Sequence, residues 1–280
     1  MRLANRGGRA VLVVDHLAYD VADITQGRFG PRPSSVLDRW EEFRAAVEQL
    51  APMGGEVFEL DQLGCPSPEP RQVFAIGLNY ASHAAETGLG APEVPAVFTK
   101  FPAALSGPVS TVELSGDTVD WEVELVVVIG IRADRVDEGD AWRHVAGLSV
   151  GQDLSDRTVQ FAAGGQFSLG KSYRGYGPVG PWLVTPDEFV DPNDVAIGCS
   201  VNGVVVQQDR SSGLLFTIPA LIAELSGVLP LLPGDLIFTG TPAGVGMAAQ
   251  PARYLRPGDL LESWADGIGP LRTRCAAPAH

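Results

Sequence analysis

Two acidic residues, Glu122 and Glu124, stand at the beginning of an apolar run that ends at Ile131. Side chains of a β-strand alternate between its two faces, so residues two apart share a face. Two carboxylates on one face of a buried strand repel each other and lose hydration. They are tolerated when they are protonated, when the strand end is exposed, or when a cation bridges them. The segment by itself leaves these alternatives open.

A third acidic residue, Asp153, follows the apolar run of residues 145–150. Three carboxylates at strand ends would form an oxygen-rich site suited to Mg²⁺, Mn²⁺ or Ca²⁺. Zinc is disfavoured, because no histidine or cysteine belongs to this pattern. Asp153 therefore favours a cation site over a solvated strand end.

His83 and Glu86 form a second candidate group. They are three residues apart in a segment with helical spacing, which places them on the same side of one helical turn. A glutamate that accepts a hydrogen bond from one ring nitrogen holds the imidazole as a neutral base at the other nitrogen. Taken alone, the motif favours an incidental pair on an exposed helix over a catalytic one.

Three motifs resemble catalytic or nucleotide-binding patterns by letters only. Residues 147–151 match a nucleophile elbow around Ser149, but only His280 follows in the chain, and residues 151–155 predict a loop where a helix is needed. Residues 175–180 match a dinucleotide fingerprint, but Pro181 follows instead of a helix. Residues 240–246 are rich in glycine without the lysine of a phosphate loop. Residues 175–180 and residues 240–246 are therefore predicted to form backbone turns. Residues 240–246 are also candidates for the lining of a pocket.

Short predicted strands account for most of the chain after residue 70. Their apolar runs cover residues 73–76, 96–99, 122–131, 145–150, 195–201, 204–207, 236–239 and 260–264. Asn202 and Gly203 predict a two-residue hairpin turn. In this part of the chain, helical spacing occurs in residues 82–86 and 218–225. We therefore predict an α+β, mostly β fold and not a doubly wound sheet.

The first 65 residues predict a small N-terminal domain. Residues 10–14 suit a strand, and apolar residues at helical spacing predict a helix that starts near Ser35 and runs to Leu50. Residues 65–71 are dense in proline, which predicts an extended connection. We place the boundary there, with a second domain over residues 70–280.

Composition limits the class of protein. The chain has 280 residues, of which 45% are hydrophobic, enough for a buried core in one large domain or in one domain with a small appendage. Its 34 acidic and 20 basic residues give a net charge of −14, and no cluster of cations suits nucleic-acid phosphates. Three widely spaced cysteines predict reduced thiols, and the apolar runs are too short to span a membrane. We expect a cytoplasmic protein that binds neither nucleic acid nor membrane.

Several segments together resemble the fumarylacetoacetate hydrolase superfamily, in the order that the family shows and over about residues 70–265. They are residues 76–86 (IGLNYASHAAE), 98–102 (FTKFP), 120–125 (DWEVEL), 151–160 (GQDLSDRTVQ), 170–172 (GKS), 177–182 (GPVGPW) and 232–246 (LPGDLIFTGTPAGVG). The resemblance implies a β-roll catalytic domain with a small N-terminal domain, usually in a homodimer. One departure is Gly213, which stands where relatives commonly carry an aspartate.

The resemblance also implies roles for particular residues. It implies a divalent-metal site, for Mg²⁺ with Mn²⁺ or Ca²⁺ as alternatives, whose ligands are Glu122, Glu124 and Asp153. His83 and Glu86 would activate a water molecule from a lid segment that orders over the substrate. Lys171 would neutralise the metal-site carboxylates and contact substrate oxygens. The implied substrate-binding residues are Tyr80, Gln160 and Thr241.

The implied activity is hydrolysis of a carbon–carbon bond in a 1,3-diketo or acylpyruvate-type 2-oxo acid. Such cleavage leaves a carbanion that must be held as an enolate, and a divalent ion chelated by the 2-oxo acid stabilises that charge. Proton transfer from water typically contributes about 10²–10⁴-fold. The same site would serve two alternatives, an oxaloacetate-type decarboxylase and a diene-dioate isomerase. A catalytically silent ligand-binding relative is the third hypothesis.

Overall fold

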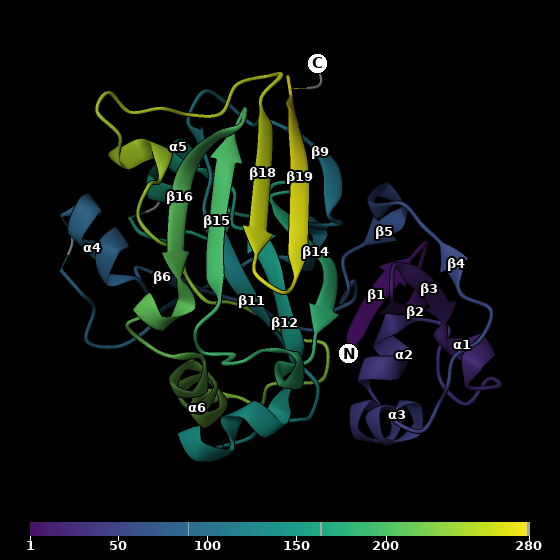
Figure 1. Cartoon of the computed structure of the whole chain (residues 1–280). Coiled ribbons are helices and arrows are strands. Elements are labelled where there is room, and N and C mark those ends of the chain that lie inside the picture. The colour runs from purple at the N-terminus through teal and green to yellow at the C-terminus, as the bar shows by residue number, and fades with distance from the viewer. Residues whose placement is uncertain (89, 163, 279–280) are drawn as a thin grey trace.

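The computed structural model describes residues 1–88, 90–162 and 164–278. Its largest element is a mixed sheet of 12 strands that runs through the whole molecule (Figure 1). In spatial order its main path is β4 (Glu56–Val57), β3 (Leu17–Asp20), β2 (Arg9–Val14), β1 (Arg2–Arg6), β14 (Gly177–Val184), β12 (Val145–Gln152), β11 (Val123–Ile129), β17 (Leu236–Phe238), β6 (Val73–Gly77) and β7 (Ala96–Thr99). Two short strands lie off this path, β5 (Leu63–Gly64) beside β1 and β8 (Leu105–Ser106) beside β14.

A second sheet of 5 strands packs against the first. Its order is β16 (Val204–Arg210), β15 (Ala196–Val201), β18 (Leu260–Ala265), β19 (Gly269–Ala276) and β9 (Val109–Glu113). The main hydrophobic core fills the space between the sheets, with Leu125 and Leu148 from one side and Ile197 and Leu271 from the other. A two-stranded ladder of β10 (Val119–Asp120) and β13 (Ser155–Asp156) lies beside the ends of β11 and β12. The α+β, mostly β fold class is confirmed.

Helices are short and lie at the edges of the sheets. They are α1 (Val21–Ile24), α2 (Pro33–Leu37), α3 (Trp40–Val47), α4 (Ala81–Thr87), α5 (Arg157–Ala162) and α6 (Ile218–Val228). Thr217 caps α6 by accepting a hydrogen bond from the Ala220 backbone N–H, and Pro219 stands in the first turn, where its missing N–H costs nothing. None of the helices in the described part of the chain is at once long and apolar enough to cross a bilayer.

The N-terminal strands continue the large sheet instead of forming a separate one. β1 pairs antiparallel with β14, and a second hydrophobic core joins Leu3 and Trp40 to Val126 and Leu236. Residues 65–71 form no regular element but pack against the rest, with the Ser67 hydroxyl donating to the Gly234 carbonyl over 2.6 Å. Figure 1 shows this N-terminal unit on the right, beside β14 and β19. The division into domains 1–65 and 70–280 stays a proposal.

Alternation along β11 sets the direction of the two glutamates. Odd-numbered residues of β11 face the core between the sheets, whereas Val126 and Val128 belong to the second core. Glu122 and Glu124 share the parity of Val126 and Val128, so they point to the side away from the five-stranded sheet. Glu122 and Glu124 therefore lie on the same face of the sheet, as the sequence predicts.

Two local expectations are wrong. The predicted helix from Ser35 to Leu50 is broken into α2 and α3, because Arg39 leaves the helical conformation between them (φ −127°, ψ 39°). The glycine-rich residues 175–180 were expected to form a turn, yet Gly177 begins strand β14. That strand needs small residues, because a side chain at Gly177 would meet Lys100 and Leu105 within 3.4 Å.

The three cysteines are buried and unpaired with one another. Burial raises the pKa of Cys65 and of Cys275 to about 12, and it also raises the pKa of Cys199. The thiolate is the reactive form, so these thiols serve as small apolar core groups.

Candidate active site

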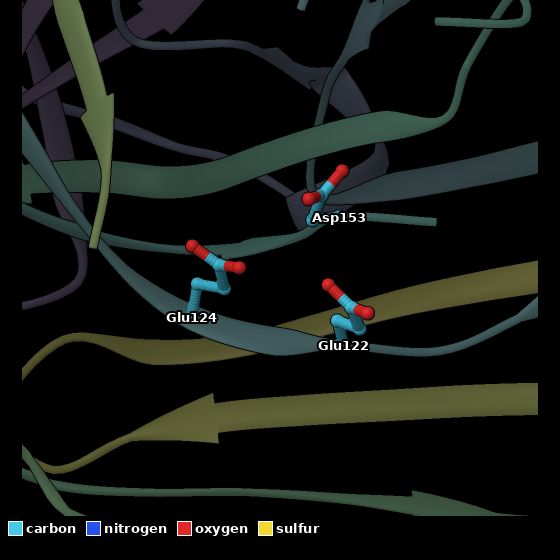
Figure 2. A group of neighbouring side chains, drawn as sticks. All are labelled: Glu122, Glu124 and Asp153. Atoms are coloured by element: carbon cyan, nitrogen blue, oxygen red, sulfur yellow. The ribbon is translucent and has the colours of Figure 1, made fainter. Parts of the chain in front are cut away.

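Glu122, Glu124 and Asp153 meet at the start of β11 and the end of β12. The two strands pair antiparallel, with Val123 opposite Gln152, so the residues just outside this pair become neighbours. The Asp153 backbone N–H donates to the Glu122 carbonyl over 2.8 Å. One carboxylate oxygen of each acid lies within 4.8 Å of the others, and all three side chains are buried. Figure 2 shows both glutamates pointing toward the segment that carries Asp153.

Three cations surround two of these carboxylates. The Lys171 ammonium lies 2.7 Å from both Glu122 Oε2 and Asp153 Oδ2. The Lys100 ammonium lies 2.6 Å from Asp153 Oδ1 and also donates to the Lys171 backbone carbonyl. Arg157 Nη2 lies 2.7 Å from Glu122 Oε1. Each oxygen of Glu122 and Asp153 therefore faces a buried positive charge.

The site shifts the pKa values of Glu122 and Glu124 in opposite directions. Burial by itself raises the pKa of Glu122, but Lys171 and Arg157 outweigh it and lower that pKa to about 2. Burial raises the pKa of Glu124 well above its ordinary value, and the negative charges of Asp153 and Glu122 add to this effect. Burial opposes the charged form of Lys171, yet Asp153 and Glu122 raise its pKa.

The donor set fits a hard divalent cation. Within the described residues, Glu124 forms no ion pair, and its only hydrogen bond in the structure is from the Gly240 backbone N–H to Oε2, over 2.7 Å. A buried carboxylate beside two others is costly unless a positive charge compensates it. Carboxylate oxygens at this spacing are the ligands that Mg²⁺, Mn²⁺ and Ca²⁺ prefer.

His83 and Glu86 form the expected pair on α4. His83 Nδ1 lies 2.7 Å from Glu86 Oε1, and the Gly244 backbone N–H donates to Glu86 Oε2 over 2.8 Å. Both carboxylate oxygens of Glu86 are therefore held, and the contact at Nδ1 orients the imidazole and its Nε2. His83 also lies close to Glu122, and a proton taken up by the imidazole would lower the pKa of that carboxyl.

The glycine-rich loop of residues 240–246 keeps Glu86 of this pair in place. Gly244 has φ +106°, and a Cβ there would collide with the Val206 carbonyl oxygen. Its carbonyl accepts from Trp121 Nε1 over 3.0 Å, while its N–H binds Glu86. The expectation of a pocket lining is also met, because Thr241 within the loop and Met247 directly after it line the cavity.

A cavity of about 190 Å³ connects the two groups. It is lined on its polar side by His83, Thr87, Glu122, Arg157, Gln160, Lys171 and Thr241. Glu124 and Asp153 are buried and are not among the residues that line the cavity. Gln160 accepts from Arg157 Nη1 over 2.9 Å, and the Thr241 hydroxyl donates to the Val123 carbonyl over 2.9 Å.

Tyr80 is placed differently from Gln160 and Thr241. It was expected to contact substrate, but its ring is fully buried in the core between the sheets and does not line the cavity. Its hydroxyl has no hydrogen-bond partner in the described part of the structure. Its backbone bridges to Leu214 and starts α4, so Tyr80 anchors the helix that carries His83.

The departure at Gly213 lies beside this tyrosine. A Cβ on Gly213 would stand 3.3 Å from the Tyr80 ring and 3.6 Å from Asp209 Oδ1. Asp209 accepts from the Ser82 hydroxyl over 3.0 Å. A carboxylate is therefore already present next to this position, and an aspartate at 213 would face it.

Sequence reasoning assigned no role to Lys100, Arg157 or Asp120, although all three stood in the quoted segments. Arg157 joins Asp120 to Glu122, and Asp120 also accepts from the Gly246 and Met247 backbone N–H groups. One signal was available in the composition. Lys100 and Lys171 are the only lysines in the chain, and every other basic side chain apart from histidine is an arginine.

The Lys100→Met variant is expected to be less stable by about 3–5 kcal/mol, because it leaves Asp153 buried with one cation fewer. Urea unfolding followed by circular dichroism measures this loss. The matched control is Arg143→Met, which removes a surface pair of 3.6 Å and is expected to change stability by about 0–1 kcal/mol. Equal effects of the two variants would contradict the assignment.

The family comparison agrees with this geometry. A family model described as "Fumarylacetoacetate (FAA) hydrolase C-terminal" matches residues 72–276. Among solved structures, the chain is similar to a putative HpcE protein from Mycobacterium smegmatis, with 47% identity and a TM-score of 0.96 over 100% of both chains.

Two further solved structures have more specific names. A maleylpyruvate hydrolase from Sphingobium sp. SYK-6, in complex with manganese (II) ion and pyruvate, is 30% identical with a TM-score of 0.81 over 100% of both chains. A probable 2-hydroxyhepta-2,4-diene-1,7-dioate isomerase from Mycobacterium abscessus is 27% identical with a TM-score of 0.82, over 100% of this chain and 99% of that one. Hydrolases and isomerases thus share this fold.

Proposed function

The chain belongs to the fumarylacetoacetate hydrolase family, and on this premise we propose that it is a divalent-metal-dependent hydrolase. Its substrate class is a 1,3-diketo, acylpyruvate-type 2-oxo acid, and the bond broken is the carbon–carbon bond between the two carbonyl units. The observation that carries the proposal is one cavity lined both by Glu122, a member of the buried cluster of three carboxylates, and by His83 of the His83–Glu86 pair.

Glu122, Glu124 and Asp153 would hold the metal, with Mg²⁺ as the first candidate and Mn²⁺ or Ca²⁺ as alternatives. When bound, the ion would supply Lewis-acid stabilisation of the negative charge that develops on the substrate's ketone oxygen. Manganese in the similar maleylpyruvate hydrolase supports a metal of this class.

His83 is the general base in this proposal. Its Nε2 takes a proton from a water molecule that attacks the distal carbonyl carbon, while Glu86 accepts the Nδ1 hydrogen and stabilises the imidazolium. The Gly244 N–H keeps Glu86 in place during this transfer. Bond cleavage then gives a carboxylic acid and the enolate of a smaller 2-oxo acid, which takes up a proton.

Lys171 and Gln160 have supporting roles. The Lys171 ammonium lies at the wall of the cavity, where it offsets the carboxylate charge and can donate to a substrate oxygen. Gln160 offers its amide N–H₂ to the cavity, because Arg157 Nη1 already donates to its carbonyl oxygen. Thr241 shapes the cavity next to β11.

The alternative is an oxaloacetate-type decarboxylase or a diene-dioate isomerase that uses the same metal site. The observation that favours it is the structural likeness to a probable diene-dioate isomerase. Neither reaction needs water to be activated, so the His83–Glu86 pair would be dispensable for decarboxylation. The homodimer, which we also propose, is tested by light scattering after size-exclusion chromatography.

The experiment is a substrate panel with metal removal. We expect purified protein to convert acetylpyruvate to acetate and pyruvate in the presence of Mg²⁺ or Mn²⁺, detected by proton NMR. Chelation with EDTA should stop turnover, and added metal should restore it. Turnover of oxaloacetate alone would support the alternative, and no turnover of either acid would support a ligand-binding relative.

A further inference from the structure

One side of the cavity is an aromatic wall, defined here as Phe98, Phe161 and Phe167. The Phe98 and Phe167 rings meet edge to face with centroids 5.7 Å apart, and the Phe167 and Phe161 rings do the same at 6.0 Å. Ile76, Leu78 and Met247 complete the apolar lining. This surface is continuous from one ring to the next.

The aromatic wall leads from the carboxylate cluster to the protein surface. At its inner end the Phe98 ring centroid lies 5.0 Å from the Lys171 ammonium, and Phe98 is 9% exposed. At its outer end Phe161 is 50% exposed. A ligand whose 2-oxo acid end lies at Lys171 would have room to extend its other end along the three rings.

The charged groups of the cavity are already engaged at its inner end. Lys171 and Arg157 each contact two carboxylates, and His83 is paired with Glu86. Along the aromatic wall and its apolar neighbours, as far as the structure describes them, no side chain carries a positive charge. A second carboxylate on the substrate would therefore find no cation there.

We propose that this cavity selects 2-oxo acids whose distal group is apolar, either alkyl or aryl, over acids that carry a second carboxylate at that end. The inference rests on the proposed function for the chemistry, and on the aromatic wall alone for the selectivity. Each methylene buried against the wall is expected to improve binding about fourfold. A carboxylate in the same place loses hydration without gaining an ion pair.

Binding is measured first, with acids that lack the second carbonyl and are not hydrolysed. The pair is 5-methyl-2-oxohexanoate and 2-oxoglutarate, which differ by two methyl groups in place of two carboxylate oxygens. Calorimetry in the presence of Mg²⁺ or Mn²⁺ is expected to give at least about tenfold tighter binding of the branched acid. Equal or tighter binding of 2-oxoglutarate would overturn the inference.

Hydrolysis separates the inference from the proposed function. Pentanoylpyruvate and succinylpyruvate have similar lengths and differ at the distal end. Preferred cleavage of pentanoylpyruvate supports both proposals, and preferred cleavage of succinylpyruvate refutes the inference while the hydrolase remains. Cleavage of neither acid, together with selective binding of the branched acid, refutes the hydrolase and supports the inference.

Two variants test whether the aromatic wall determines the selectivity. Phe161→Arg adds a cation at the outer ring and is expected to improve 2-oxoglutarate binding relative to the branched acid by about fivefold. Phe161→Ala removes apolar area and is expected to weaken only the branched acid. The matched control is Leu169→Arg, which adds the same charge at a residue that is 67% exposed and outside the cavity lining. An equal shift in the control would show a general charge effect and contradict the inference.

Discussion

Glu124→Gln is expected to abolish metal binding and to lower kcat/KM for acylpyruvate hydrolysis by about 10³-fold. Lewis-acid stabilisation is worth several kcal/mol of transition-state energy, and about 1.4 kcal/mol corresponds to a factor of ten. Glu124 is the most informative ligand to change, because it forms none of the ion pairs that bind Glu122 and Asp153 into the fold. Titration calorimetry with Mg²⁺ and Mn²⁺ measures the affinity directly.

The stability of the same variant provides an independent readout. Without metal, the glutamine removes like-charge repulsion among three buried acids, so its melting temperature is expected to equal or exceed that of the wild type. Added metal should raise the melting temperature of the wild type only. The control is Glu113→Gln, on the exposed side of β9. Unchanged metal affinity in Glu124→Gln would contradict the proposed site.

His83→Ala is expected to lower acylpyruvate hydrolysis by about 10²–10⁴-fold while leaving metal affinity unchanged. In the described part of the structure the imidazole forms an ion pair or hydrogen bond with Glu86 and with none of the three acids, so its loss removes the base and keeps the ligands. Rates with saturating metal, measured by pyruvate release, give the size of the loss. Glu86→Gln, which retains an oxygen acceptor for the Gly244 N–H, is expected to have a smaller effect.

The His83→Ala variant also distinguishes hydrolysis from decarboxylation. A decarboxylase needs the enolate to be stabilised but needs no attacking water, so its rate on oxaloacetate should survive the change. Partial recovery of acylpyruvate hydrolysis on addition of free imidazole would support the assignment of a base. A hydrolysis rate close to that of the wild type would remove His83 from the mechanism and favour the decarboxylase.

Periodic features of the sequence predicted much of the site. The strand period of two placed Glu122 and Glu124 on one face, and the helical turn placed His83 beside Glu86. Both are properties of neighbouring residues in a regular backbone, so they do not depend on the rest of the fold. The meeting of Asp153 with the glutamates required one further assumption, that two apolar runs pair as antiparallel neighbours.

Interactions between distant segments were beyond such reasoning. Lys100 reaches Asp153 from 53 residues away, and the Gly244 N–H fixes Glu86 from a distance of 158 residues. The hydroxyl of Tyr80 could bind a ligand, but its ring packs into the core between the sheets and is buried there. A residue type shows what a side chain is able to bind, whereas its neighbours decide what it meets.

The amino-acid sequence by itself determined the strand-rich fold class, the acidic faces and the histidine pair, because local periodicity and apolar patterning are written in consecutive residues. Only the tertiary structure decided how the buried charges are balanced, where the cavity lies and that its outer wall is aromatic. These features depend on side chains from separate strands and loops, whose distances are set when the two sheets pack together.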